Sequence, residues 1–170
     1  PDTLVILSPH GDGIGDRMVI PLHEKYQSHF EDFGDLHTSK VWLADFALIH
    51  DIRESSALLR SALFLQHNDR LDYGSAIPLH LLANHLKCKI VPITSSGTDL
   101  QQHYQLGKEL QESLQRTPSR VAIIASADLS QRVSSESPEG LSTHGLVFDE
   151  QIQNILISNN SLQLLDLDSS

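Results

Sequence analysis

The segment TLVILSPHG, residues 3–11, decides the fold class of this 170-residue chain. Residues 3–8 form a continuous apolar run with β-branched members, which is typical of a strand that is buried on both faces of a sheet. The Pro-His-Gly sequence that follows ends this strand. We therefore expect a central strand almost at the start of the chain, with His10 at its carboxyl end.

Two later segments repeat the pattern of a short apolar run that ends in small or polar residues. They are KIVPIT at 89–94 and RVAIIA at 120–125. Each is bounded by polar or turn-forming residues and has the length of an ordinary strand. We expect all three runs to be central strands of one sheet.

Helices are predicted between and after these strands, because apolar residues recur there at helical spacing. The helix after the second strand has Thr98 or Asp99 as its expected cap. Ser, Pro and Gly are frequent in residues 134–143, which predicts a loop there. The predicted helices cover residues 52–66, 76–86, 99–115 and 148–157.

Strands that alternate with helices of this length indicate an α/β fold, with a mixed or parallel central sheet flanked by helices. Functional residues of such folds gather at the carboxyl ends of the strands, so we expect His10, Ser95 and Asp128 to share one edge. The length suits a single domain over residues 1–170. We also expect this domain to lack N- and C-terminal flanks, since the first strand has no lead-in and an apolar, possibly helical stretch at 162–167 stops near the last residue.

Composition excludes several classes of function. The formal net charge is -10, from 22 acidic and 12 basic residues, which argues against nucleic acid as a partner. No apolar run approaches the roughly 20 residues of a spanning helix, so no membrane partner is expected. The single Cys88 cannot form an intrachain disulfide and no leader sequence precedes Pro1, which favours a cytoplasmic location. We interpret Cys88 as a packing or surface thiol.

Three positions could carry chemistry, and each also has a purely structural interpretation. His10 can bind a divalent metal through neutral imidazole, or it can simply cap the end of the strand. In the segment LDYGSAIPL at 71–79, Gly74 would permit a positive φ in a tight loop that presents side chains into a cleft. Alternatively, Asp72 caps the following helix and Tyr73 packs. Asp128 follows the third predicted strand, and its carboxylate can orient another group at the carboxyl end of the sheet.

Other common signatures are missing from the sequence. The glycines of GDGIG, residues 11–15, do not fit the G-x-G-x-x-G dinucleotide fingerprint. No G-x-S-x-G nucleophile elbow occurs, which leaves a hydrolase as a minor option.

Three motifs in order, S-P-H-G, L-D-x-G-x-x-x-P-L and V-x-x-I-A-S-x-D-L-S, make the chain resemble the class III extradiol dioxygenase B-subunit superfamily. The Memo-like proteins are more distant relatives of that superfamily. The resemblance covers nearly the whole chain. It implies opening of catechol-type rings by O₂ at a non-haem Fe(II) held by two histidines and one carboxylate. His10 matches the second metal histidine, whereas the other histidine and the Glu have no counterpart in residues 1–170.

The resemblance also identifies two exchanged positions. Family members usually have D-H-G where this chain has Asp72-Tyr73-Gly74, and D-L-S-H where it ends in Gln131. The histidines of family members transfer protons during catalysis. The resemblance therefore implies that Tyr73 and Gln131 occupy catalytic positions. Tyrosine has an unperturbed pKa of about 10 and glutamine does not titrate, so acid/base catalysis should fall by roughly 10² to 10⁴.

Two functions from different classes therefore stay open. One is an extradiol dioxygenase with both proton-handling histidines substituted, which binds an aromatic diol and suspected Fe(II). The alternative is a catalytically inactive homologue that serves as a binding or assembly subunit, in a homo- or hetero-oligomer. A metal-dependent hydrolase or another activity on the same fold is a third reading.

Overall fold

The computed structural model describes residues 1–11, 17–95, 97 and 99–167. Contacts within the chain define two compact units, Pro1–Ala127 and Asp128–Ser170. The expectation of one α/β domain over the whole chain stays a prediction.

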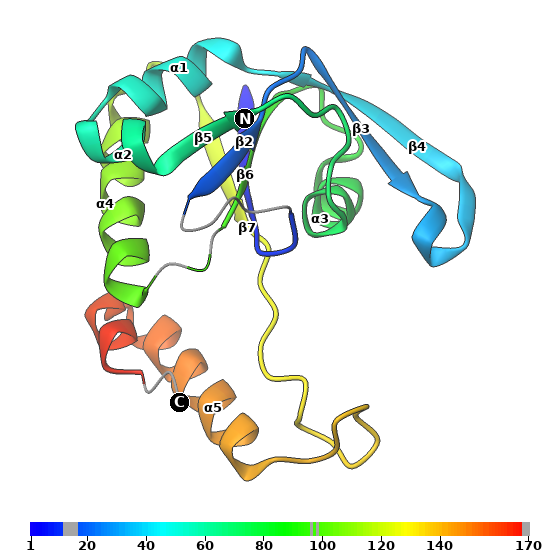
Figure 1. Ribbon diagram of the computed structural model, residues 1–170, viewed down its shortest axis with the longest axis vertical. Helices are drawn as coiled ribbons and strands as arrows, with labels where there is room; N and C mark the ends of the chain where they lie inside the picture. The colour runs from blue at the N-terminus through cyan, green and yellow to red at the C-terminus, as the bar shows by residue number, and fades with distance from the viewer. Residues whose placement is uncertain (12–16, 96, 98, 168–170) are drawn as a thin grey trace. The chain divides into compact units, whose positions relative to one another are not determined.

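The first unit is built on a sheet that has seven strands in its described part, drawn in Figure 1. Five of them follow the order β3-β4-β6-β1-β7, while β2 pairs with β5 and β6. The strands are β1 (Thr3–Ser8), β2 (Met18–Pro21), β3 (Lys25–Phe30), β4 (Asp35–Ala44), β5 (Leu63–Gln66), β6 (Lys89–Thr94) and β7 (Val121–Ala125).

Strand β1 lies between two parallel neighbours, as its apolar run predicts. Thr3 pairs with Lys89 of β6 on one side and with Val121 of β7 on the other. The β3–β4 pair is antiparallel, and so is the short contact between β2 and β6. The sheet is therefore mixed, which confirms the predicted fold class.

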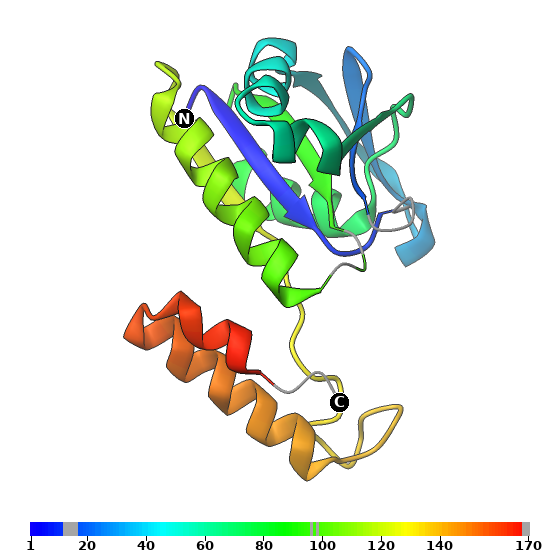
Figure 2. The same cartoon turned by 60° about the vertical axis from the view of Figure 1, so that its left-hand side comes forward.

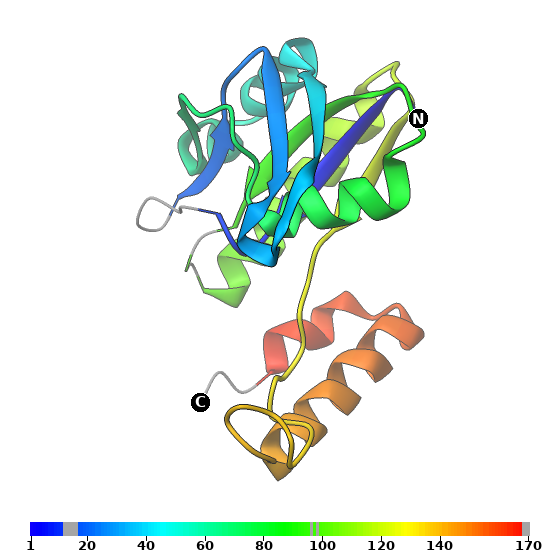
Figure 3. The ribbon, with the colours of Figure 1, turned by 90° about the vertical axis from the view of Figure 1, so that its right-hand side faces the viewer.

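Helices cover both faces of this sheet. Figure 2 shows α4 (Leu100–Arg116) along one face, where α1 (Phe46–Glu54) and α2 (Ala57–Ala62) also pack, and Figure 3 shows α3 (Tyr73–Ala83) on the other. Successive residues of β1 alternate between the two cores: Leu4 and Ile6 pack on the α3 side, and Val5 packs on the α4 side. Burial on both faces explains the continuous apolar run Leu4–Leu7 within β1.

Strand β7 differs from its expected central position. It lies at the end of the described strand order and pairs with β1. Its residues are half-buried or exposed, and Ile123 is 51% exposed. An apolar run of five residues is compatible with an edge strand as well as a central one, so composition could not separate the two.

The predicted helix over 52–66 is wrong in its second half. The chain forms α1, then α2, then strand β5. Ser56 caps α2 by accepting a hydrogen bond from the Leu59 N–H at 3.2 Å, which separates the two helices. The apolar Leu63–Gln66 segment pairs with β2 instead of continuing the helix.

Helix α3 begins three residues earlier than predicted and ends at Ala83. Asp72 is its cap, and Pro78 therefore lies in the second turn instead of the first. Helix α4 is confirmed: Asp99 caps it by accepting from the Gln102 N–H at 2.8 Å. Thr98, the other candidate cap, lies outside the described residues.

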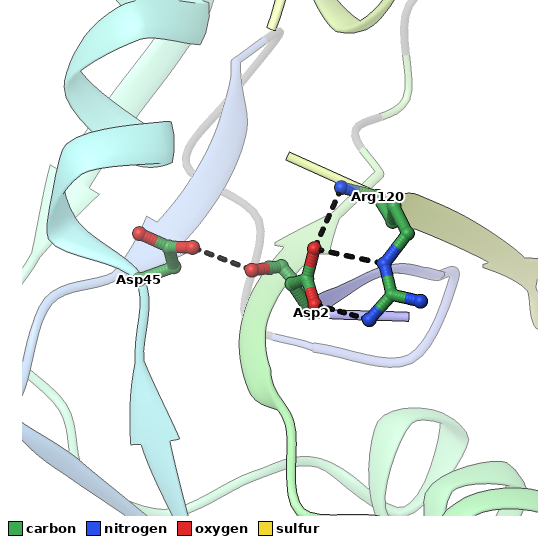
Figure 4. Close-up of polar contacts among 4 residues, drawn as sticks. Asp2, Asp45 and Arg120 are labelled. Carbon is green, nitrogen blue, oxygen red and sulfur yellow. Dashed lines mark hydrogen bonds and ion pairs between the residues drawn. The ribbon is translucent and has the colours of Figure 1, made fainter. Parts of the chain in front are cut away.

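The amino end of the sheet is held together by polar contacts (Figure 4). Asp2 receives hydrogen bonds from the backbone N–H and the guanidinium of Arg120, at 2.7 to 3.2 Å. These contacts lower the pKa of Asp2 from 3.8 to about 2. The Thr3 hydroxyl donates to Asp45, the cap of α1, at 2.5 Å. Together they connect the ends of β1, β7 and α1.

The second unit contains α5 (Thr143–Ser158) and a 3-10 helix, η2 (Ser161–Asp166). Helix α5 starts five residues before the predicted residue 148. The predicted loop over 134–143 is confirmed up to Ser142, and the apolar stretch at 162–167 lies mostly in η2. No helix within the described residues is long and apolar enough to cross a membrane.

Candidate functional site

His10 lies directly after β1, at the carboxyl end of the strand, and its side chain is exposed to solvent. Its backbone N–H donates to the Ser8 hydroxyl oxygen at 3.2 Å. Ser95 follows the neighbouring parallel strand β6, and its N–H donates to the Ser8 carbonyl at 2.7 Å. His10 and Ser95 therefore lie at the same edge of the sheet, as the alternation of strands and helices predicts.

Tyr73 is the first residue of α3 and contacts the imidazole of His10 in two ways. Its hydroxyl oxygen lies 2.7 Å from Nδ1 of His10, and the two rings stack with centroids 4.4 Å apart and planes 27° apart. Tyr73 is 45% exposed. The structure thus brings together His10 and Tyr73, two of the three residues that the family resemblance implies for the site. The third is Gln131.

The hydrogen bond between these rings can run in either direction. If Tyr73 donates to Nδ1, the proton of a neutral imidazole lies on Nε2. If Nδ1–H donates to the Tyr73 oxygen, Nε2 carries a lone pair that can bind a metal. In the second arrangement the hydroxyl proton of Tyr73 is free to donate to a bound molecule. The pair can therefore present either a metal ligand and a hydroxyl donor, or an N–H donor.

Asp72 holds the start of α3 against the end of β1. Its carboxylate accepts from the backbone N–H of Ser75 at 3.0 Å and from the Ser75 hydroxyl at 2.9 Å. The Ser8 hydroxyl also donates to it. The structural interpretation of Asp72 as a helix cap is confirmed.

Gly74 serves close packing and not an unusual backbone angle. The described glycines with positive φ are Gly34 and Gly140, so the predicted positive φ at Gly74 is wrong. A Cβ at Gly74 would lie 2.8 Å from Cδ2 of His10 and closer still to the Ser8 hydroxyl. Only a residue without a side chain lets α3 approach His10 this closely.

A cavity of about 260 Å³ lies beside His10 and Tyr73. Drug-sized ligand sites span roughly 300–1,000 Å³, so this cavity suits a small molecule. Its lining is mostly polar and comes from strand ends, the β3–β4 connection and the segment before α3. The lining includes His10, Gly11, Pro21, His29, Asp32, Gln66, Asn68, Arg70, Leu71, Asp72, Tyr73 and Thr94.

Three polar residues of this lining are not predicted by the sequence. His29 belongs to β3, Asp32 to the 3-10 helix η1 (Glu31–Phe33), and Arg70 to the segment before α3. The Arg70 guanidinium lies 3.8 Å from the Asp32 carboxylate. The sequence signal that could have indicated a strand around His29 is the alternation in KYQSHF, residues 25–30, where Tyr26, Ser28 and Phe30 are buried.

Gln131 and Asp128 belong to the second unit, where the Gln131 amide donates to the Asp128 carboxylate at 2.9 Å. Their expected place at the edge that carries His10 stays a prediction. Cys88 is half-buried against the core on the α3 side, and burial raises the pKa of its thiol. This fits the packing role expected for it.

The described residues do not complete a site for the iron that the resemblance implies. Non-haem Fe(II) of this type is held by two histidines and a carboxylate. Within the described ranges, no group of three or more His, Cys, Asp or Glu side chains could hold a metal ion. His10 offers one imidazole, and Asp72, the carboxylate nearest in sequence to Tyr73, is already engaged by Ser8 and Ser75.

Comparison with known proteins shows the family. Residues 1–170 match the family described as the catalytic LigB subunit of aromatic ring-opening dioxygenase, and the chain belongs to this family. This confirms the resemblance to the class III extradiol dioxygenases. The α/β architecture with a mixed sheet is consistent with that membership.

Two curated relatives are similar to the chain. Protein CA_C1420 of Clostridium acetobutylicum is 25% identical over 182 residues, which cover 99% of this chain and 38% of the relative. A 3,4-dihydroxyphenylacetate 2,3-dioxygenase of Escherichia coli is 28% identical over 87 residues, which cover 49% of this chain and 32% of the relative. The chain thus spans about a third of the length of these relatives.

Proposed function

We propose that this chain forms part of an extradiol-type dioxygenase site, in which the cavity beside His10 binds a catechol-type ligand. Family membership supports the reaction class, and the dioxygenase name of one relative supports an aromatic diol as the ligand. The observation that carries the proposal is the contact between His10 and Tyr73 at the wall of the cavity. It joins an imidazole and a phenolic hydroxyl where a small ring can reach both.

Iron is the cofactor that the family implies, and His10 is the residue that we propose as one of its ligands. The other ligands would have to come from outside the described residues, because no set of three is found among them. We therefore assign no step of the reaction to the metal. This chain's own residues would bind and orient the ligand.

Tyr73 is suited to hold a ligand hydroxyl and poorly suited to move its proton. The phenol can donate or accept one hydrogen bond in the cavity, but a phenol is in general a poorer proton carrier at neutral pH than an imidazole. Gln131, which we propose as the second exchanged position of the site, has no exchangeable proton of suitable acidity. Ring opening should therefore be slower than with histidine at both positions.

The test uses the full-length protein, loaded anaerobically with Fe(II) and then given catechol and O₂. We expect stoichiometric iron and catechol-dependent O₂ uptake. The variant His10→Gln should lose both, while His50→Gln, which changes an exposed histidine of α1, should keep them. Iron binding that is unchanged in His10→Gln would contradict the assignment of the ligand.

A catalytically inactive homologue is the second candidate, and the exchange of both proton-handling positions favours it. In that case catechol would bind in the cavity without O₂ uptake, even with iron present. Titration calorimetry with catechol under anaerobic conditions measures binding separately from turnover. A cytoplasmic location and a homo- or hetero-oligomeric state stay predictions.

A further inference from the structure

A second cavity lies between α2, α4 and the sheet, and we infer that it binds a small apolar molecule of about the size of benzene. This apolar cavity is separate from the one beside His10. Its ability to bind such a molecule does not depend on the proposed function.

The apolar cavity lies on the α4 side of the sheet, opposite the face that α3 covers (Figures 2 and 3). Strands β2 and β6 give consecutive residues to the two cavities. Met18 and Ile93 line the apolar cavity, while Val19 and Thr94 line the cavity beside His10. Since consecutive side chains of a strand point to opposite faces, the sheet separates the two cavities. They share no residue among those that the structure describes.

The walls of the apolar cavity come from three layers of side chains that are otherwise well packed. The sheet, α2 and α4 each contribute, and most of the contributing side chains are buried. Gly107 of α4 also lines the cavity and is exposed, so the cavity reaches the surface of the protein beside this helix. The main apolar lining residues are Leu7, Leu59, Leu63, Ile93, Leu106 and Leu110.

Water is a poor occupant of this cavity. A buried water needs two to four polar partners. In the described part of the lining, the polar side chains are those of Ser95 and His103. The Ser95 N–H already donates to the Ser8 carbonyl, and Nδ1 of His103 lies 3.2 Å from the Asp99 carbonyl oxygen. Few polar groups are therefore left to hold water here.

The volume of the cavity, about 150 Å³, sets the size of the ligand. An apolar protein cavity of about this volume stays dry and binds benzene or xenon. An empty cavity lowers stability in proportion to its volume, because the atoms around it lose packing contacts. A molecule that fills the cavity restores those contacts and stabilises the folded state by mass action.

Benzene is the probe that tests this site, on full-length protein labelled with carbon-13 at the Leu and Ile methyl groups. We expect saturable binding with a Kd of roughly 1 mM. The methyl shifts should be largest at Leu59, Leu63 and Ile93, while Leu79 and Ile90, which pack on the α3 side, should not move. Phenol should bind the same methyl groups at least about tenfold more weakly, because its hydroxyl would be buried without a sufficient partner.

Two variants on α4 form a matched pair. Leu106→Phe takes up space in the cavity and should weaken benzene binding about tenfold or more. Leu100→Phe makes the same change at a residue that is 42% exposed and does not line the cavity, so the Kd should stay the same. If Leu106→Phe is poorly folded by circular dichroism, Met18→Phe decides, because Met18 lines the cavity but is only half-buried.

Three results would overturn the inference. One is the absence of saturable shifts at the lining residues. Another is an unchanged Kd in a well-folded variant that fills the cavity. The third is competition by saturating catechol, because it would place benzene in the cavity beside His10. A Kd that catechol leaves unchanged supports a separate apolar site.

Discussion

The hydroxyl oxygen of Tyr73 lies 2.7 Å from Nδ1 of His10, and the two rings stack with their centroids 4.4 Å apart. The residues are 63 positions apart in the chain. The end of a parallel strand and the start of a helix thus combine an imidazole and a phenol at one cavity.

Tyr73→Phe should keep the ring stack and remove the hydrogen bond. The neutral imidazole of His10 should then show a different ratio of its two tautomers, because Nδ1 loses its partner. Nitrogen-15 NMR of the metal-free protein near pH 8 measures that ratio. The free energy of unfolding should fall by no more than about 1 kcal/mol, since the pair is exposed to water. Unchanged His10 nitrogen shifts would contradict the hydrogen bond.

Gly74→Ala should displace His10 or the start of α3. The added Cβ would lie 2.8 Å from Cδ2 of His10, which is too close for any carbon contact. We expect destabilisation of about 1–3 kcal/mol, measured by urea unfolding. Gly107→Ala is the matched control, because Gly107 lies inside α4 with no atom within 4 Å of an added Cβ. That change should stabilise the protein by about 0.5–1 kcal/mol.

Asp72 and Asp99 cap α3 and α4 in the same way, so the stability effects of replacing each by alanine can be compared. Asp99→Ala should cost about 0.5–2 kcal/mol, the usual range for loss of a capping side chain. Asp72→Ala should cost more, because Asp72 also accepts from the hydroxyls of Ser8 and Ser75. Equal losses of unfolding free energy for the two variants would show that the contact with Ser8 contributes little.

Asp2 should titrate well below an ordinary aspartate. Hydrogen bonds from Arg120 lower its pKa from 3.8 to about 2 in the folded protein. A carboxyl with a lowered pKa contributes stability that is fully present above about pH 4 and is lost as the pH falls toward 2. Carbon-13 NMR of the carboxyl group follows the titration directly.

Arg120→Gln should return the pKa of Asp2 toward 3.8, while Asp35 serves as the control. The pKa of Asp35 is also lowered to about 2, but by hydrogen bonds from Thr38 and His37. It should not respond to the change at Arg120. A wild-type Asp2 that titrates near 3.8 would show that the pairing with Arg120 is absent in solution.

Introducing histidine at Tyr73 and Gln131, the two positions that we propose as exchanged, should create or raise ring cleavage if the rest of the proposed site is intact. The double variant Tyr73→His and Gln131→His supplies groups that titrate near neutral pH, for an expected gain of roughly 10² or more in kcat. O₂ uptake with catechol on iron-loaded full-length protein measures it. No gain, with iron shown to be bound, would count against the assignment of Tyr73 and Gln131 to one site.

The elements that the sequence predicts well are those whose whole length is buried or strongly amphipathic. Strands β1 and β6 have a continuous apolar run in their middle because both of their faces are covered. Helix α4 has a clear apolar stripe and a capping aspartate. Strands β3 and β4 were missed because their outer faces are polar or exposed, as at Lys25 and Ser39. Strand β5 lies in a segment that the sequence predicts as helix, because a short apolar run fits both the helical and the strand period.

The site was predictable only where a motif carried it. The motifs around His10 and Tyr73 predict that both residues line one pocket, and the structure places their side chains in contact beside a cavity. Their roles in a reaction stay predictions. His29, Asp32 and Arg70 carry no local sequence signal for this site. His29 and Asp32 reach the cavity from the β3–β4 hairpin and its connection, and Arg70 reaches it through its bridge to Gln27 of β3. Tertiary pairing, and not local pattern, brings them there.

The contacts of Asp72 and Tyr73 have a consequence for how such a site can change. Asp72 binds Ser8, whose oxygen receives the main-chain N–H of His10, while the next residue, Tyr73, touches the imidazole itself. Backbone placement and side-chain chemistry are thus controlled by two separate neighbours. A substitution at position 73 would therefore change the group that touches the imidazole, while the hydrogen bonds that place the backbone of His10 remain.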